Sequence, residues 1–351
     1  MKIDLFMEFA TPPFAGREEA AVFEDCFTLA RAADSSGFDA VWVAEHHFLG
    51  DYSHAAAPDM LLAAMARETS RIGLGFGVVP LTLHDPVRVA ERLATLHLIS
   101  KGRLLWGVGR GVTVTELEGF GVDPAVSREI FAERLAALRE MLETGIAKRD
   151  GAQYRLQPDP ASTPRDGWLA AVSPESFALA ADLGLNVMTG PFKPWPLIKA
   201  DLARYRKLRP TGETSFTLGV YCEEDGAAAR RRAEPGLVWG YRKIFEIAGP
   251  LLSQRTPGYE YYRKLGVAAP VLDKVMGLRL LESMGLAAVG DPDHVARRLK
   301  NLRDSGLDRV SLMIGGGDLS VAETTRCVEL LAQRVLPQLA ADDSELRVAA
   351  S

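Results

Sequence analysis

Cysteine is scarce in this sequence, and its scarcity excludes two kinds of protein. The 351 residues include three cysteines, Cys26, Cys222 and Cys327, which lie far apart in the chain. An odd number of widely separated thiols cannot form a disulfide framework, and none of them has the C-x-x-C spacing of a cysteine metal site. Because 47% of the residues are hydrophobic, the chain can instead bury a large core.

Long apolar runs and basic tracts are also missing. No apolar stretch approaches the length of a membrane span. The first residues lack the apolar core and the small-residue cleavage site of a signal peptide. The formal net charge is -5, and both signs of charge are mixed along the chain. Together these absences predict a cytoplasmic protein that binds neither nucleic acid nor a membrane.

The sequence does contain a regular alternation of short apolar runs and amphipathic segments, which is typical of parallel strands joined by right-handed helical crossovers. We expect eight strands, at residues 3–9, 39–45, 72–79, 103–107, 168–172, 186–188, 215–222 and 309–314. Helices are expected at residues 17–36, 58–70, 86–100, 128–145, 174–183, 194–208, 291–305 and 320–339. Eight such units predict an α/β protein, a (β/α)8 TIM barrel in which residues 1–351 form one domain. An open doubly wound sheet is the alternative.

Two segments interrupt the alternation. Residues 148–166 carry three prolines and are expected to form a loop or a small excursion. Residues 223–286 are mostly helical in pattern but are broken by Gly-Pro and Pro-Gly dipeptides. We expect this long insertion to precede the last strand. Long insertions in a compact domain are often lids, so residues 248–286 are predicted to form a mobile lid.

A candidate anion site follows two of the expected strands. Ser173 suits the N-cap of a helix and Pro174 suits its first position. Because Ser176 stands where a capping box would need Glu or Gln, its hydroxyl is expected to point outward with the free N–H groups. Arg110 ends the neighbouring strand, and a guanidinium can bind two phosphate oxygens at once. These residues predict a phosphomonoester site; the alternative is helix capping beside a surface arginine.

The glycines before Arg110 resemble the start of a dinucleotide-binding fingerprint. The G-x-G-x-x-G motif would need glycine at position 112, where Val112 stands, and no helical pattern follows at once. We therefore predict no Rossmann nucleotide site.

A histidine pair ends the second expected strand, in the run Glu45-His46-His47. Successive side chains of a strand point to opposite faces, so the two histidines cannot both bind one metal ion. The other histidines show no H-x-H or H-E-x-x-H spacing, and we predict no metal site. One histidine is expected to face the barrel mouth, where it suits proton transfer near neutral pH. The alternative is that both are hydrogen-bonded structural residues.

The run AEHHF at residues 44–48, at the end of the second expected strand, resembles the same place in the bacterial luciferase-like flavin-dependent monooxygenases, also called alkanal monooxygenase-like. The wider blocks at residues 35–48, 72–86, 100–111 and 289–305 follow in the family's order. The resemblance therefore spans nearly the whole chain.

The resemblance implies a barrel that binds FMN at the carboxyl ends of its strands. It places Arg110, Ser173 and Ser176 at the flavin phosphate, where Val172 contributes its backbone. It also places an unusual cis peptide beneath the flavin ring at Gly75-Phe76. The full set of cofactor-binding residues that it implies is Glu45, Gly75, Phe76, Arg110, Val112, Val172, Ser173 and Ser176.

The family's chemistry implies a two-component monooxygenase and a homodimer. A separate NAD(P)H:flavin reductase would supply FMNH2, since no nicotinamide site is evident in the chain. Oxygen would add at flavin C4a to give a peroxide, which passes one oxygen atom to a small organic substrate. His46 would handle protons as a catalytic residue, and Glu45 would shape the flavin pocket.

Two other functions stay open on the sequence. A deazaflavin-dependent oxidoreductase of the same superfamily is one, although the EHHF run argues against it. A non-catalytic flavin-binding protein is the other, although such proteins are shortened barrels. The resemblance to luciferase-like enzymes also implies that the expected lid lies over the flavin, with Arg279 able to reach anionic groups. We expect the cavity wall to include Met7, Phe76, Trp195 and Tyr221. The alternative is that these apolar residues belong to the barrel core.

Overall fold

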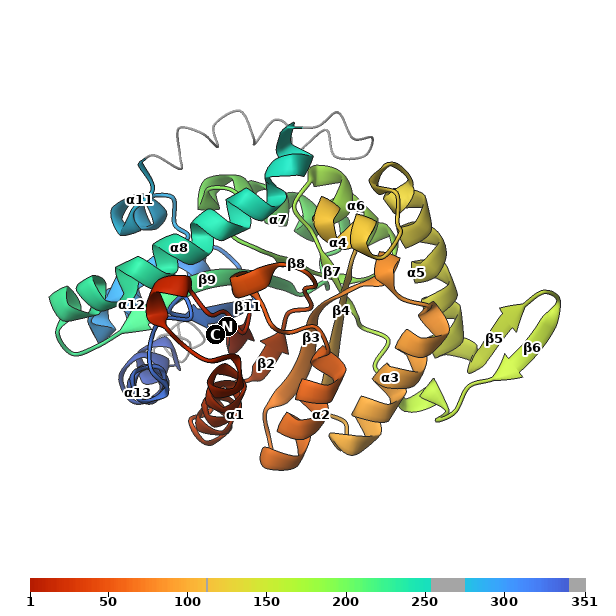
Figure 1. Ribbon diagram of the computed structural model, residues 1–351, viewed down its shortest axis with the longest axis horizontal. Helices are drawn as coiled ribbons and strands as arrows, with labels where there is room; N and C mark the ends of the chain where they lie inside the picture. The colour runs from red at the N-terminus through yellow and green to blue at the C-terminus, as the bar shows by residue number, and fades with distance from the viewer. Residues whose placement is uncertain (112, 254–274, 341–351) are drawn as a thin grey trace, which may run out of the picture.

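Eight parallel strands close into a barrel in the computed structural model, which describes residues 1–111, 113–253 and 275–340 (Figure 1). Around the barrel the order is β11-β1-β2-β3-β4-β7-β8-β9, and β9 pairs with β11 to close it. The barrel strands are β1 (Lys2–Met7), β2 (Ala40–Val43), β3 (Gly73–Pro80), β4 (Leu104–Gly109), β7 (Trp168–Ala170), β8 (Asn186–Thr189), β9 (Thr214–Cys222) and β11 (Arg309–Ile314). The predicted (β/α)8 barrel is confirmed, and its closure excludes an open sheet.

Helices lie around the outside of the barrel and over the carboxyl ends of its strands (Figure 1). They are α1 (Glu19–Ser35), α2 (Pro58–Glu68), α3 (Pro86–Ile99), α4 (Val114–Gly119), α5 (Ser127–Thr144), α6 (Pro174–Asp182), α7 (Trp195–Leu208), α8 (Gly226–Ser253), α11 (Leu278–Ser283), α12 (Pro292–Asp304) and α13 (Val321–Leu330). The insertion between β9 and β11 holds α8 and α11, before the last barrel strand as expected. Within the described ranges, no helix combines the length and the apolar character needed to cross a membrane.

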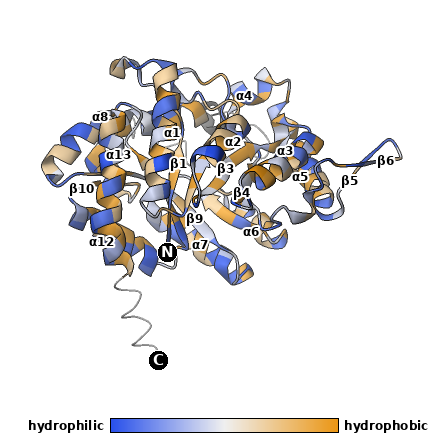
Figure 2. Ribbon diagram, turned by 90° about the horizontal axis from the view of Figure 1, so that it is seen from below, coloured by the Kyte–Doolittle hydropathy of each residue, from blue (hydrophilic) through white to orange (hydrophobic). Residues whose placement is uncertain are grey.

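Two β elements were not predicted from the sequence. Strands β5 (Ile146–Arg149) and β6 (Ala152–Arg155) form an antiparallel hairpin in the segment expected to be a loop or a small excursion. Nearly all its residues are exposed, so no alternation of apolar and polar residues marks it, and Figure 2 shows it as a largely hydrophilic projection. Strand β10 (Ala287–Gly290) pairs with the last residues of β9. Its four small residues are too short a run to show a pattern.

Polar and aromatic side chains fill the amino-terminal half of the barrel. Asp4 accepts two hydrogen bonds of 2.8 Å from the buried Arg309 and one of 2.9 Å from the indole of Trp42. The ring of Trp42 occupies the space beside Gly75, where an added Cβ would lie 2.7 Å from the ring carbon Cδ2. This half of the barrel is filled, and a cavity opens toward the carboxyl ends of the strands, where barrel enzymes place their chemistry.

Two glycines allow helix α8 to approach the loop after β11. A Cβ added at Gly316 would overlap the carbonyl of Gly236 and lie 2.7 Å from the backbone nitrogen of Leu237. Because these are backbone atoms of a packed helix, they cannot move aside cheaply. We expect Gly316→Ala to lower the free energy of unfolding by about 1–3 kcal/mol, the usual cost of overpacking. Urea unfolding followed by circular dichroism measures this loss.

Gly240, on the same helix, is the matched control because nothing lies within 4 Å of its Cβ position. Gly240→Ala should leave stability unchanged or raise it, since alanine favours helix over glycine by about 1 kcal/mol. Equal stability of the two variants would contradict the close approach at Gly316.

Candidate active site

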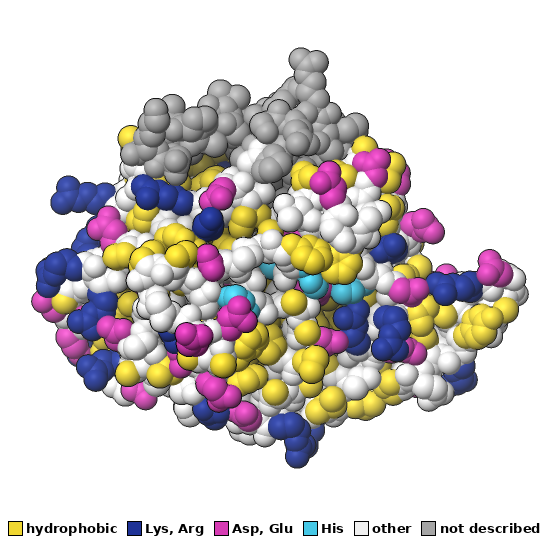
Figure 3. All heavy atoms as spheres, in the orientation of Figure 1, with side chains coloured by type: hydrophobic (Ala, Val, Ile, Leu, Met, Phe, Trp, Pro, Cys, Tyr) yellow, Lys and Arg dark blue, Asp and Glu magenta, His cyan; other side chains and the backbone are white. Residues whose placement is uncertain are grey.

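A cavity of about 480 Å³ opens at the carboxyl ends of the barrel strands. This volume lies in the range of small-molecule and cofactor sites, about 300–1,000 Å³. Much of the wall is apolar and includes Phe131, Leu169, Leu179, Met188 and Met313. On the face shown in Figure 3, histidine side chains gather across the middle of the molecule. Two groups of polar residues interrupt the apolar wall, one around Ser173 and one around His46.

The first polar group contains all three residues of the predicted phosphate site. Arg110 follows β4, while Ser173 and Ser176 lie at the start of α6, and all three line the cavity. They meet because β4 and β7 are neighbouring parallel strands, so the segments after them leave the barrel side by side. Val172 also lines the cavity, whereas Val112 lies outside the described residues.

The hydroxyl of Ser176 does not point outward as expected. It accepts hydrogen bonds from the backbone nitrogens of Val172 and Ser173, both at 3.1 Å, and donates to the Ser173 carbonyl at 2.7 Å. The Ser173 hydroxyl accepts from the Ser176 nitrogen in return, which completes a capping box. The prediction was wrong because a serine is long enough for the reciprocal bond that is usually made by Glu or Gln.

The second polar group centres on His46, which is held between two carboxylates. Its Nδ1 lies 3.1 Å from Glu116, and its Nε2 lies 3.6 Å from Glu8. Glu116, at the start of α4, also accepts from the His47 backbone nitrogen at 2.8 Å and from the Thr113 hydroxyl at 2.7 Å. Since its bond partners fix this carboxylate, the orientation of the imidazole is fixed as well.

Electrostatics keep His46 protonated at neutral pH. Burial by itself lowers the pKa of His46, but the hydrogen bond with Glu116 and the charges of Glu8, Glu116 and Glu45 raise it to about 9. Burial raises the pKa of Glu8, and the charge of His46 and the Tyr52 hydroxyl offset this only in part. The site therefore presents an imidazolium next to a carboxyl group that holds its own proton more tightly than usual.

Replacing Glu116 by glutamine should lower the pKa of His46 below about 9, because the neutral amide removes the strongest of the groups that raise it. NMR titration of the His46 ring measures the shift. The folded pKa of His46 exceeds the unfolded value of about 6.5, so its ion pairs stabilise the fold below pH 6.5. That contribution disappears as the pH rises through 9, and the variant should lose part of this pH dependence.

The exposed Glu118, on the same short helix, provides the control. Glu118→Gln removes a charge without touching His46. The titration curve of His46 in this variant should match that in the unaltered protein. An unchanged His46 titration in Glu116→Gln would show that this contact does not set the proton affinity.

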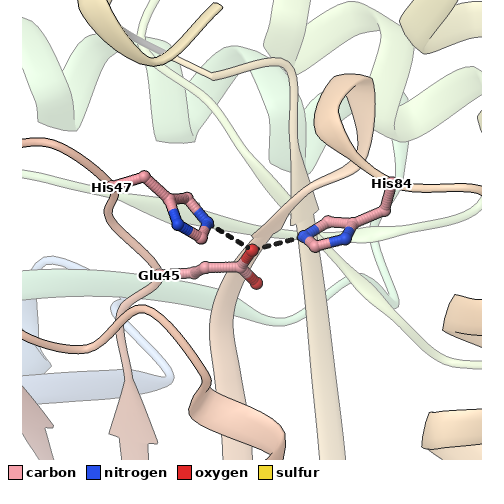
Figure 4. A group of neighbouring side chains, drawn as sticks. All are labelled: Glu45, His47 and His84. Carbon is pink, nitrogen blue, oxygen red and sulfur yellow. Dashed lines mark hydrogen bonds and ion pairs between the residues drawn. The ribbon is translucent and has the colours of Figure 1, made fainter. Parts of the chain in front are cut away.

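Glu45, also on the cavity wall, lies between the rings of two further histidines, His47 and His84 (Figure 4). His47 Nε2 lies 3.1 Å from Glu45 Oε1, and His84 Nε2 bonds the same oxygen. Burial raises the pKa of Glu45, but the hydrogen bonds from the two histidines outweigh it and the net pKa is lowered. Glu45 is thus a carboxylate at neutral pH. Its contact with His84 was not predicted, because the two residues are 39 positions apart in the sequence.

Glu45, His47 and His84 are close enough to be considered as a metal site. Arg92 argues against that use, because its guanidinium lies 3.0 Å from Nδ1 of His84. Arginine can only donate, so Nδ1 accepts and the proton of a neutral ring sits on Nε2. A nitrogen that carries a proton cannot bind a metal ion, and metal-binding histidines donate from the other ring nitrogen. These contacts describe a hydrogen-bonded network around the Glu45 carboxylate.

The cis peptide lies two residues beyond its predicted place. It joins Gly77 and Val78, which line the cavity, while Gly75 and Phe76 do not. Gly75 instead makes room for Trp42, and Phe76 is buried in the core between barrel and helices. Three glycines alternate along β3, so the sequence could not show which of them borders the cavity.

Three further residues expected on the cavity wall belong to the core instead. Met7 is buried in the core, as alternation along β1 brings Phe6 and Glu8 to the cavity. The ring of Trp195 packs on Phe216 at 5.1 Å between centroids. Tyr221 is buried, and its hydroxyl donates to Glu223 at 2.7 Å. At these three positions the structure agrees with the alternative expectation, that the residues belong to the barrel core.

The predicted lid is described only in part. Residues 254–274 lie outside the described residues, whereas Ile244, Ile247 and Ala248 of α8 line the cavity. Arg279 is exposed at the start of α11 and is not on the cavity wall. The lid therefore remains a prediction.

Sequence reasoning missed Glu8, Tyr52 and Glu116 altogether. Glu8 follows β1, and since β1 pairs with β2, it lies beside the segment that carries His46. That placement could have been inferred, because the residue after each barrel strand is a candidate. Tyr52 and Glu116 lie on a short 3-10 helix and a short α-helix, which no periodic pattern marks.

A profile described as luciferase-like monooxygenase matches residues 1–309. Limonene 1,2-monooxygenase of Rhodococcus erythropolis is 28% identical over 338 residues, or 92% of this chain and 82% of that protein. The oxygenase component of the flavin-dependent trigonelline monooxygenase of Acinetobacter baylyi is 28% identical over 178 residues, or 48% and 49%. The crystal structure of the monooxygenase RslO1 from Streptomyces bottropensis matches with a TM-score of 0.80 and 26% identity, over 97% of this chain and 100% of that one.

The closed barrel, with its cavity at the strand ends, and the profile match define the class of this protein. The chain belongs to the luciferase-like monooxygenase family. The resemblance drawn from residues 44–48 and the four wider blocks is thereby confirmed.

Proposed function

We propose that this protein is the oxygenase of a two-component system, which uses FMNH2 and O2 to insert one oxygen atom into a small apolar molecule. The observation that carries the proposal is that Arg110, Ser173 and Ser176 share one cavity with a protonated His46. The first three suit a phosphate monoester, and the last suits proton donation. A homodimer in the cytoplasm is part of the proposal.

The residues present fit a flavin phosphate. The backbone N–H groups of Val172 and Ser173, which bond Ser176 here, are donors at a helix N-terminus that a phosphate could engage. Among the described residues, the buried hydroxyl of Thr189 has no hydrogen-bond partner, although this residue lines the cavity. A polar ligand can satisfy such a group, whereas an empty apolar cavity would leave it at a cost.

Bound FMNH2 would supply the electrons that activate oxygen. The chain's own part is to exclude water and to deliver protons. The apolar wall around Met188 and Met313 excludes water and suits an apolar substrate. Glu116 holds Nδ1 of His46, so the proton available for transfer is the one on Nε2. Glu8 stands opposite that atom and can return a proton to it.

The test is turnover under isotopically labelled O2, with FMNH2 supplied by a free NAD(P)H:flavin reductase and a panel of apolar terpenes as substrates. Label in a product, detected by mass spectrometry, is the expected result. Anaerobic titration with a reduced deazaflavin is the companion measurement. Binding of the deazaflavin but not of FMNH2 would favour the deazaflavin-dependent alternative. Binding of FMNH2 with no labelled product from any substrate would favour a non-catalytic flavin-binding protein.

A further inference from the structure

A buried lysine lies directly behind the predicted phosphate site. Lys193 follows β8, and 1% of its side chain is exposed. Its ammonium group donates to the Val172 carbonyl at 2.6 Å and forms an ion pair with Asp201 of α7. It also lies 5.6 Å from the ring centroid of Phe177, on α6. Burying a charge in this way is costly unless it is paired and hydrogen-bonded, so each of these contacts matters.

The contact with Val172 controls the orientation of one peptide group. The peptide between Val172 and Ser173 is trans, so its C=O and N–H point in opposite directions. Lys193 draws the carbonyl to one side of this peptide. The N–H of Ser173 consequently points to the other side, toward the Ser176 hydroxyl on the cavity wall.

The opposite orientation of this peptide would disfavour binding of a phosphate. Without a donor behind it, the Val172 carbonyl could rotate toward the cavity and present a partial negative charge to a phosphate. Lys193 holds that oxygen away from the cavity, and Asp201 holds Lys193 in place. The Val172 oxygen, the Lys193 ammonium and the Asp201 carboxylate do not need to touch the phosphate for this effect.

We propose that Lys193, anchored by Asp201, is a positioning residue that holds the Ser173 N–H on the cavity side of its peptide, where it can donate to the phosphate of a flavin mononucleotide in place of the Ser176 hydroxyl. This inference rests on the proposed function, since it assigns a support to the same site. A positioning role also differs from a purely structural one in its consequence. Loss of Lys193 should weaken binding of the phosphate and not of the flavin ring.

The experiment compares the dissociation constants of FMNH2 and of reduced riboflavin, which lacks the phosphate, in anaerobic titrations of the full chain. The unaltered protein should prefer FMNH2, and Lys193→Met should lose about tenfold of that preference, as expected for a bond to an ion. Affinity for reduced riboflavin should stay within about twofold. Lys199→Met, an exposed lysine of α7, is the matched control and should keep the full preference.

A second variant covers the case in which Lys193→Met fails to fold because Asp201 is left charged and buried. The double variant Lys193→Met/Asp201→Leu removes both charges, and such replacements are often tolerated. It too should lose the preference for FMNH2. Folded variants that keep the full preference would overturn the inference while leaving the phosphate site intact. An unaltered protein that binds both flavins equally would overturn the phosphate site itself.

Discussion

Replacing His46 by asparagine is expected to lower the rate of product formation by about 100- to 10,000-fold, the usual contribution of a positioned acid or base. Asparagine can still donate a hydrogen bond to Glu116 from its amide group, but it cannot act as an acid and transfer a proton at neutral pH. Single-turnover reactions with FMNH2 already bound measure the loss separately from cofactor binding. Because the pKa of His46 is raised to about 9, the rate in the unaltered protein should be constant at neutral pH and fall as the pH passes 9.

His294 offers a matched control for this experiment. It also faces a glutamate, with Nε2 at 3.3 Å from Glu282, but it lies on α12 and not on the cavity wall. His294→Asn should therefore retain the rate of the unaltered protein. A folded His46→Asn protein that kept more than about a tenth of the rate would remove His46 from the mechanism, because a positioned acid or base contributes at least about 100-fold. The cavity would then have to draw its protons from elsewhere.

Replacing Arg110 by methionine is expected to weaken FMNH2 binding by at least about 100-fold. A guanidinium can make two charge-assisted hydrogen bonds to one phosphate, each worth about 1.5–3 kcal/mol. Methionine keeps much of the length of the side chain without the charge. The dissociation constant should rise less as salt is added than it does for the unaltered protein, since a charge–charge term has been removed.

Arg88, on α3, is the control for Arg110. Its side chain is 72% exposed, so Arg88→Met removes the same charge far from the buried wall. Its affinity for FMNH2 should be unaltered. An Arg110→Met protein with unaltered affinity would show that the cofactor does not place its phosphate beside β4 and α6.

Local sequence patterns were enough to predict the barrel strands and to place Arg110, Ser173 and Ser176 at one end of the barrel. Apolar runs of three to nine residues that alternate with amphipathic segments are a local signal, and a serine followed by proline marks a helix start wherever it occurs. Arg110 and Ser173 could be paired because both come directly after a strand, and parallel strands end at one face of the barrel. The hairpin β5–β6 was missed because its exposed residues carry no such pattern.

The environment of His46 could not be predicted in the same way. Glu8 and Glu116 are 38 and 70 positions away from it in the chain, and they approach it only when β1 pairs with β2 and α4 packs over the strand ends. The same is true of Lys193 and Val172, which are separated by 21 positions. Single charged residues at such separations leave no periodic signal.

The sequence by itself determined the succession of the eight barrel strands, the family and the identity of the residues that follow each strand, because these depend on neighbouring residues. Only the tertiary structure decided how far along each strand the cavity reaches, so that Gly77 lines it while Gly75, on the same side of β3, lies beside the ring of Trp42. It also decided the charge of His46, because a pKa depends on burial and on the distance to other charges. Those quantities exist only once distant segments have packed together.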